Sequence, residues 1–230
     1  MNNLFDVVKK NGYAFISNFF SPSEVSTLKN RLLKIYLQCS IGDQIDIPGK
    51  IIKNQYSIGK SMRIYPEAYG EFPEFTRFQD NNLSNLVDDF FDKSFNKRLQ
   101  VFSSYETLTY NDVSSLPRNA YMHIDPYHSL KFLCYLTDTN KSNGALQIIP
   151  ETAWIGKNIR NENSIESLLS SDLYTFTKSN YYDKSYEDKI VYVEGKAGDL
   201  IILDTDTLHC GGIILDKGLE RMTIICHNRK

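Results

Sequence analysis

Short apolar runs in the C-terminal half constrain the fold of this chain more than any other feature. They hold alternating or continuous apolar residues, and Gly, Asn and Asp stand between successive runs. This rhythm suits an antiparallel barrel or jelly roll better than a parallel sheet with crossover helices. The runs cover residues 99–110, 120–124, 130–137, 145–149, 190–193, 199–203 and 221–227.

The N-terminal region has a strand pattern followed by a clear helix start. Residues 13–16 predict a short strand. Ser21 can cap a helix, Pro22 suits its first position and Glu24 completes a capping box. Apolar residues then recur at helical spacing, and the helix should end before Gly42.

A second helix is predicted over residues 82–95, whose apolar residues fall on one face. The chain has 230 residues, 41% of them apolar, which is enough for one core, so we expect a single domain over 1–230. Its fold class should be mainly β with flanking helices. A helical part is expected over about 1–98 and a jelly-roll core over about 99–230. The polar segment 151–189 interrupts the β rhythm and is expected to cover a site or to be partly mobile.

Composition narrows the possible partners. Lys and Arg number 26 against 28 Asp and Glu, for a net charge of -2, and the charges are scattered, which argues against binding nucleic acid or an anionic membrane. No stretch approaches the ~18 apolar residues of a membrane helix, and the start lacks a secretory signal, so a cytoplasmic location is expected. The four cysteines form no CxxC pair, so neither disulfides nor a zinc knuckle is expected.

The first motif with chemical content is His123-Ile124-Asp125. Side chains alternate along a strand, so His123 and Asp125 should project from one face and can grip one ion. A lone tripeptide of this kind arises readily by chance, and by itself it is more often an ordinary turn at a strand end.

The second motif is the run 198–212, which reads as a glycine turn, a buried strand, a loop and then His209 at the start of the next strand. His209 would supply a third metal ligand. Two imidazoles and one carboxylate leave three octahedral positions open, as in iron(II) oxygenases that bind a cosubstrate and dioxygen. A structural or hydrolytic zinc site is a poorer match to this set.

Arg221 opens a strand twelve residues after His209, and it shares a face with Thr223. A guanidinium and a hydroxyl placed in this way can converge on one carboxylate. Taken alone, such an arginine is more often an edge residue paired with a surface acid. Following three candidate metal ligands, binding of a carboxylate is the better interpretation.

In this order the motifs resemble the phytanoyl-CoA dioxygenase family of iron(II)/2-oxoglutarate oxygenases over most of the chain. The matching segments are 12–25, 123–125, 135–138, 143–146, 198–209 and Arg221. The resemblance implies a double-stranded β-helix, or cupin-like jelly-roll core, that uses iron(II), 2-oxoglutarate and dioxygen. It also implies roles for six residues: His123, Asp125 and His209 hold iron, and Arg221 binds the distal 2-oxoglutarate carboxylate, helped by Thr223 and Tyr135.

Two comparisons with the family pattern bear on the reaction. Family members commonly have Pro-Gly-Ser-His where this chain has Pro150-Glu151-Thr152-Ala153, so the substrate of relatives is not carried over. Halogenating relatives have a small residue at the position of Asp125, so its presence favours hydroxylation or a related oxidation.

The function expected is oxidation of an unactivated carbon in a small-molecule or carrier-bound substrate, with release of succinate and CO2. A nucleic-acid demethylase of this superfamily would have a second arginine six residues after the first, where this chain has His227. A non-catalytic jelly-roll binding module would have lost a ligand or the arginine, and a non-oxygenase cupin would group its histidines differently. Substrate identity and oligomeric state cannot be read from the sequence.

Three further residues are left open. His128 should point into a loop, although contact with substrate is an alternative. Lys131 shares a predicted strand face with Tyr135, so it lies either at an anion-binding position or at a solvent-facing strand end. His227 should be too far along its strand to reach iron, at ~3.3 Å per residue.

Overall fold

The structure, a computed structural model, describes residues 4–45, 49–53, 60–65, 70–91, 100–107, 118–170 and 175–229. Its helices are α1 (Leu4–Asn11), α2 (Pro22–Gln38), α3 (Asn81–Phe91), α4 (Ala153–Glu162) and α5 (Ile165–Ser170), with 3-10 helices at Pro73–Gln79, Arg118–Ala120, Phe176–Lys178 and Lys184–Lys189. Its strands are β1 (Tyr13–Ile16), β2 (Gln44–Ile45), β3 (Gly49–Lys53), β4 (Lys60–Ile64), β5 (Gln100–Glu106), β6 (Ser129–Tyr135), β7 (Leu146–Ile148), β8 (Val191–Val193), β9 (Leu200–Asp204), β10 (His209–Cys210) and β11 (Arg221–Arg229).

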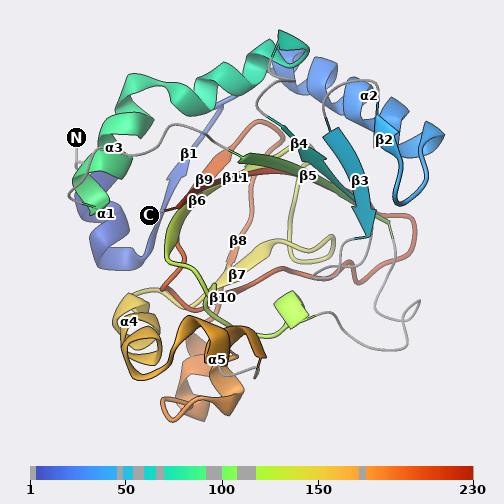
Figure 1. The fold of residues 1–230 in the computed structure, drawn as a ribbon. Helices are drawn as coiled ribbons and strands as arrows, with labels where there is room; N and C mark the ends of the chain where they lie inside the picture. Colours follow the sequence, from blue (N-terminus) through green and yellow to red (C-terminus); the bar gives the residue numbers. More distant parts are fainter. Residues whose placement is uncertain are drawn as a thin grey trace.

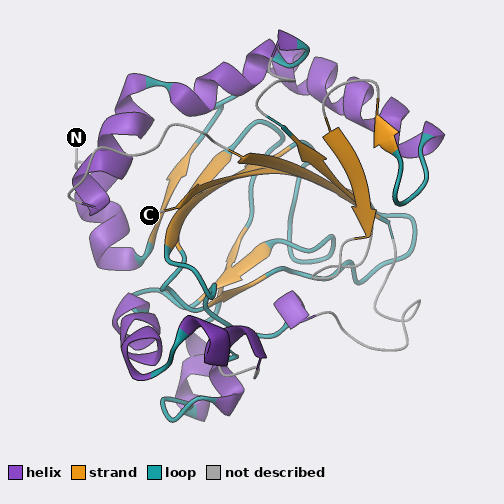
Figure 2. Cartoon of the chain, viewed as in Figure 1, coloured by secondary structure: helices purple, strands orange, loops and turns teal. Residues whose placement is uncertain are grey.

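Two β-sheets form the centre of the molecule (Figures 1 and 2). The larger has eight strands in the order β1-β9-β6-β11-β5-β4-β3-β2, and the smaller has three in the order β10-β7-β8. Every pairing between these strands is antiparallel. Apolar side chains of β6 and β9 meet those of β7 and β8 between the sheets. This arrangement confirms the predicted jelly-roll, or double-stranded β-helix, with flanking helices.

Strand β6 shows how alternation divides the core in two. It lies between β9 and β11, so that Leu133 is paired with Ile201 on one side and with Ile225 on the other. Leu133 and Tyr135 point into the layer between the sheets. Phe132 and Cys134 point the opposite way, into the layer under the helices. One short strand therefore contributes to both layers.

Helices α1, α2 and α3 run along the outer side of the larger sheet (Figure 1). Helix α2 begins as predicted: the Ser21 hydroxyl accepts a bond from the Glu24 N–H, and the Glu24 carboxylate accepts one from the Ser21 N–H. Leu28 and Leu32 on its inner face are fully buried. The helix ends at Gln38, before the glycine expected to terminate it.

Most of the predicted strands are present. The runs 130–137, 145–149, 190–193, 199–203 and 221–227 correspond to β6, β7, β8, β9 and β11 within two residues at each end. The runs 82–95 and 99–110 are represented by α3 and β5, and their remaining residues lie outside the described part of the chain, apart from Thr107, which follows β5.

The prediction of a helical part over about 1–98 was incomplete. The expected strand over residues 13–16 is present as β1, but that part also contributes β2, β3 and β4, which were not predicted, to the larger sheet. Strand β1 pairs with β9, with Tyr13 opposite Leu203. These strands extend both edges of the sheet, so the N-terminal part and the β core share one sheet.

The predicted strand over 120–124 was wrong. The chain forms a 3-10 helix at Arg118–Ala120 and then an irregular segment in which His123 makes isolated backbone bridges to Thr175 and His209. Pro126 follows closely, and because proline has no N–H to donate, it prevents the ladder from continuing.

The polar segment 151–189 has more regular structure than its sequence indicated. It contains α4, α5 and two 3-10 helices. Ile155, Ile159 and Leu168 pack into a small core with Ile124 and Leu208, which belong to other parts of the chain. The segment exposes the opposite faces of its helices, which explains its polar composition. Among the described residues, no helix is both long and apolar enough to cross a membrane.

Helix α4 packs tightly against the loop after β9, which gives a first prediction. A Cβ built on Gly156 would lie 2.1 Å from the carbonyl oxygen of Asp206. Gly156→Ala should therefore lower the free energy of unfolding by about 1–3 kcal/mol, because the backbone must shift. Gly70→Ala is the matched control, since its Cβ would meet no described atom within 4 Å. Chemical denaturation measures both, and equal stability of the two variants would contradict this close contact.

Candidate active site

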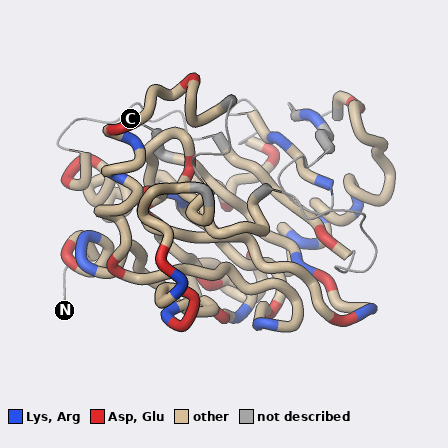
Figure 3. Tube along the Cα trace, turned by 90° about the horizontal axis from the view of Figure 1, so that it is seen from below, with Lys and Arg blue, Asp and Glu red and all other residues tan. Residues whose placement is uncertain are grey.

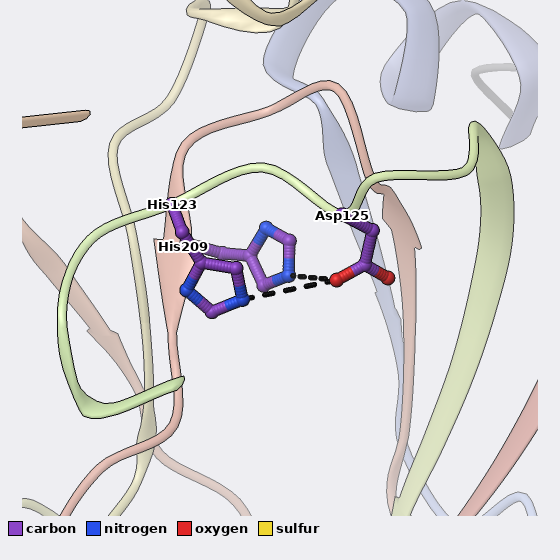
Figure 4. Close-up of side chains that lie close together, drawn as sticks. All are labelled: His123, Asp125 and His209. Carbon is purple, nitrogen blue, oxygen red and sulfur yellow. Dashed lines mark ion pairs between the residues drawn. The ribbon is translucent and has the colours of Figure 1, made fainter. Parts of the chain in front are cut away.

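His123, Asp125 and His209 lie close together, as predicted (Figure 4). The His123 N–H donates to the His209 carbonyl at 2.9 Å, and the His209 N–H donates to the His123 carbonyl at 3.0 Å. This bridge sets the two imidazole rings 4.6 Å apart. Asp125 turns one carboxylate oxygen, Oδ1, toward both rings, 3.7 Å from His123 Nε2 and 3.4 Å from His209 Nε2. The three side chains converge because of this bridge and the following turn, instead of through the expected strand.

Both imidazoles present the same nitrogen to this group. His123 Nδ1 lies 2.7 Å from the Tyr121 carbonyl, and His209 Nδ1 lies 2.8 Å from the Thr207 carbonyl. Because a carbonyl only accepts, each Nδ1 is the donor in its contact, and each ring turns its Nε2 toward the Asp125 carboxylate. Burial, and then the charge of Lys131, lowers the pKa of His209 to about 4. A neutral imidazole of this kind is suited to binding a metal.

Lys131 also lies at the candidate metal site. The sequence had left open whether its side chain faces an anion or the solvent. Its ammonium lies 2.9 Å from Asp125 Oδ2 and 3.3 Å from His209 Nε2. Burial alone would raise the pKa of Asp125, but Lys131 and the two histidines hold that pKa well below its usual range. The signal in the sequence was the shared strand face of Lys131 and Tyr135.

A second group of charged side chains contacts the backbone of the loop that carries Asp125, a candidate metal ligand. Arg160 of α4 donates to the carbonyl oxygens of Asp125 (2.9 Å) and Pro126, and to the Asp206 carboxylate. His128 Nε2 lies 2.9 Å from Asp204 Oδ1 and 3.5 Å from Asp206 Oδ2. We call Arg160, Asp206, Asp204 and His128 the Arg160 clamp. His128 is thus engaged by carboxylates, and the clamp joins α4 to both loops that carry the candidate ligands.

Arg221 is buried among polar groups at the start of β11. Its guanidinium donates to the Gly144 carbonyl and to the carboxylate of Glu106, its cross-strand partner on β5. Its Nε is buried and has no hydrogen-bond partner among the described residues. Glu106 was not predicted as a site residue, although a carboxylate within a predicted apolar strand was a signal that a cation lay nearby.

Thr223 and Tyr135 lie on adjacent strands near Arg221, as expected, but both hydroxyls already have partners. Thr223 Oγ1 lies 2.8 Å from Ser104 Oγ. The Tyr135 hydroxyl donates to the Val193 carbonyl at 2.8 Å and accepts from the Leu146 N–H at 3.0 Å. Tyr135 therefore has no proton left to donate to a carboxylate, whereas the Thr223 and Ser104 hydroxyls keep one between them.

These residues fit the groups that the sequence implied. Two imidazole nitrogens and a carboxylate oxygen within 4.8 Å of one another suit iron(II), which accepts both donor types. The unpaired Nε of Arg221 suits an anionic oxygen such as that of an oxoacid.

The Arg160 clamp gives a second prediction. Arg160→Met removes the donors to the Asp125 and Pro126 carbonyls, so the loop should hold its carboxylate less firmly and the affinity for Mn(II), a stand-in for iron(II), should fall about 10–100-fold. Lys157→Met removes the same charge from an exposed position on α4 and should bind Mn(II) as the wild type does. Calorimetric titration of both variants tests this. Unchanged affinity in Arg160→Met would show that the clamp serves packing alone.

Comparison with solved structures supports the fold. The chain is similar to the non-haem α-ketoglutarate dependent epimerase SnoN from nogalamycin biosynthesis, with 12% identity, a TM-score of 0.64, and coverage of 99% of this chain and 82% of that one. It is also similar to the carbocyclase SnoK from the same biosynthesis, with 14% identity, a TM-score of 0.60, and coverage of 100% and 84%. HygX from Streptomyces hygroscopicus, with nickel and 2-oxoglutarate bound, has 14% identity, a TM-score of 0.58, and coverage of 100% and 87%. At these identities the likeness establishes the fold alone.

Comparison at the level of sequence identifies the family. No curated protein matches the chain. The model of the phytanoyl-CoA dioxygenase (PhyH) family, however, matches residues 8–215, which include the three candidate metal ligands but not Arg221 or Thr223. Members of this family are non-haem iron enzymes that use 2-oxoglutarate and dioxygen, so the expected enzyme class and cofactors are confirmed. The chain belongs to the phytanoyl-CoA dioxygenase family.

Proposed function

We propose that the enzyme hydroxylates, or otherwise oxidises, an unactivated carbon of a small-molecule or carrier-bound substrate and releases succinate and CO2. The observation that carries this proposal is the convergence of His123 Nε2 and Asp125 Oδ1, from an irregular segment, with His209 Nε2, from β10. Three ligands on one side of an octahedral metal leave three positions for the oxoacid and dioxygen. When bound, these groups supply the oxidising power, and the protein supplies binding, orientation and exclusion of water.

Arg221 is proposed to bind the distal carboxylate of 2-oxoglutarate. Its unpartnered Nε provides one donor, and the hydroxyl pair of Thr223 on β11 and Ser104 on the neighbouring β5 provides a second. In this proposal Tyr135 lies beside the oxoacid without donating a hydrogen bond to it, because its hydroxyl already bonds β6 to the smaller sheet.

Exclusion of water is proposed to come from the apolar side chains on either side of the ligands. Leu146, Ile148 and Leu203 lie in the layer between the sheets, and Ile124 and Leu208 lie under α4 and α5. His209 itself is only 2% exposed. A dry site strengthens each electrostatic contact that holds an anionic oxoacid.

A small-molecule substrate is the class that we favour. Two of the similar structures were solved with such molecules: SnoN with α-ketoglutarate and nogalamycin RO, and HygX with hygromycin B. Basic and acidic residues are intermixed over the described trace, without a separate basic surface (Figure 3), so we do not expect nucleic acid as a substrate. The single domain over 1–230 and the cytoplasmic location stay predictions.

One observation favours the alternative, a non-catalytic jelly-roll binding module. Glu106 already neutralises Arg221, so the guanidinium is not free to bind an oxoacid at full strength. Binding of 2-oxoglutarate in the presence of Glu106 therefore has to be measured directly.

Anaerobic titration with iron(II) and 2-oxoglutarate tests the proposal. The wild type should develop the visible charge-transfer absorption of the iron–oxoacid chelate. His209→Ala should lose it, because one of three ligands is gone, and Arg221→Ala should need at least about tenfold more 2-oxoglutarate, a loss of ~1.4 kcal/mol. His227→Ala is the control histidine, packed edge-on to Phe102 and distant along β11 from Arg221. Absence of the absorption in the wild type would make the binding module the better reading.

Glu106→Gln separates competition from support at Arg221. Removing one partner of this buried pair should destabilise the ligand-free protein by about 3–5 kcal/mol. It should also tighten 2-oxoglutarate binding to the metal-loaded protein about tenfold, because a competing negative charge is gone. Glu220→Gln, which loses a half-exposed pair with Lys29, is the control. Calorimetry measures both affinities, and weaker binding in Glu106→Gln would mean that Glu106 orients Arg221 instead of competing.

A further inference from the structure

Lys131 is the charged group at the candidate metal site to which neither the family pattern nor the proposed mechanism assigns a role. It projects from β6 on the same face as Leu133 and Tyr135, through an otherwise apolar layer. Its side chain is only 13% exposed. Burying an ammonium is costly unless a partner compensates for the lost water, so its contacts need an explanation.

The two oxygens of Asp125 have different partners. Oδ1 faces His123 Nε2 at 3.7 Å and His209 Nε2 at 3.4 Å. Oδ2 points away from the histidines to the Lys131 ammonium, at 2.9 Å. The carboxylate is thus held with one oxygen toward the candidate metal position and the other bonded to a cation.

Metal binding would affect the two contacts of Lys131 differently: it would displace the contact with His209 but not the one with Asp125. The ammonium lies 3.3 Å from His209 Nε2, the nitrogen whose lone pair a metal would take. A bound metal must replace that contact. The bond to Oδ2 uses an oxygen that metal binding through Oδ1 does not need, so it can persist.

This division matters because carboxylates bind metals through one oxygen or through both. Binding through both would use a coordination position that the oxoacid requires, since 2-oxoglutarate takes two positions and dioxygen takes one. A cation bonded to Oδ2 makes that oxygen a poorer metal ligand. It also offsets the charge of Asp125, which favours an anionic oxoacid beside the metal.

We propose that Lys131 is a positioning residue that restricts Asp125 to metal binding through Oδ1 and thereby keeps a coordination position for 2-oxoglutarate. The inference rests on the proposed function, because it concerns the same metal and oxoacid. It distinguishes Lys131 from a residue that merely stabilises the fold, because loss of its charge should weaken 2-oxoglutarate binding without weakening metal binding.

Lys131→Met, which keeps the apolar stem and removes the ammonium, is the main test. Mn(II) affinity should equal or exceed that of the wild type, because a repelling charge is gone and Asp125 is free to use both oxygens. Affinity of the metal-loaded protein for 2-oxoglutarate should fall at least about tenfold. Calorimetry measures both affinities, and the anaerobic iron(II) charge-transfer absorption gives an independent reading of the second.

Three further variants complete the design. Lys131→Gln, also neutral, should behave as Lys131→Met does and serves if the Met variant does not fold. Lys131→Arg keeps a cation near Oδ2 and should bind 2-oxoglutarate more like the wild type than either neutral variant. Lys196→Met removes an ammonium that is 78% exposed and bonded to Asp138, and it should change neither affinity.

The outcomes separate this inference from the proposed function. If the wild type binds neither metal nor 2-oxoglutarate, the proposed function itself is wrong. If the wild type binds both and the neutral variants bind 2-oxoglutarate equally well, the role of Lys131 is wrong and the proposed function stands. Loss of Mn(II) affinity in the neutral variants would also overturn the inference, since it would show that Lys131 only supports the ligand geometry.

Discussion

The backbone bridge between His123 and His209 is the interaction on which the rest of the site depends. Two reciprocal N–H···O bonds join segments that are 86 residues apart in the chain. They fix the distance between the imidazoles, and the carbonyls of Tyr121 and Thr207 then fix which nitrogen each ring presents. Because these hydrogen bonds orient both imidazoles in the metal-free protein, the candidate ligands are arranged before a metal binds.

Charge balance is the second constraint, and it links groups that lie on different elements. Lys131 offsets Asp125, Glu106 offsets Arg221, and Arg160 offsets Asp206. Each pair is largely buried, so removal of one member leaves a costly charge behind. The charges at the site are therefore already paired, and an incoming metal ion or anion must compete with these ion pairs.

Periodicity and motif order predicted the β core, the start of α2 and the group of His123, Asp125 and His209. They could not predict that His123 would lie in an isolated bridge, because a single backbone pair has no repeating pattern. Helices α4 and α5 were not predicted, because the polar residues on their outer faces made the whole segment resemble a loop. Glu106 and Lys131 were missed or left open for a related reason: their roles come from cross-strand register and side-chain reach, which one strand's sequence does not contain.

The contact of Gly156 with the Asp206 carbonyl, together with Arg160, makes the polar segment 151–189 part of the structure that supports the candidate metal site. Such segments are natural candidates for exchange when the substrate range of an enzyme is to be altered. Here an exchanged segment would have to keep a glycine and an arginine four residues apart on its first helix, or the loop that carries Asp125, a candidate metal ligand, would lose the hydrogen bonds that support it. Diversification of substrate range in this chain is therefore limited by metal retention, and the two properties must evolve together.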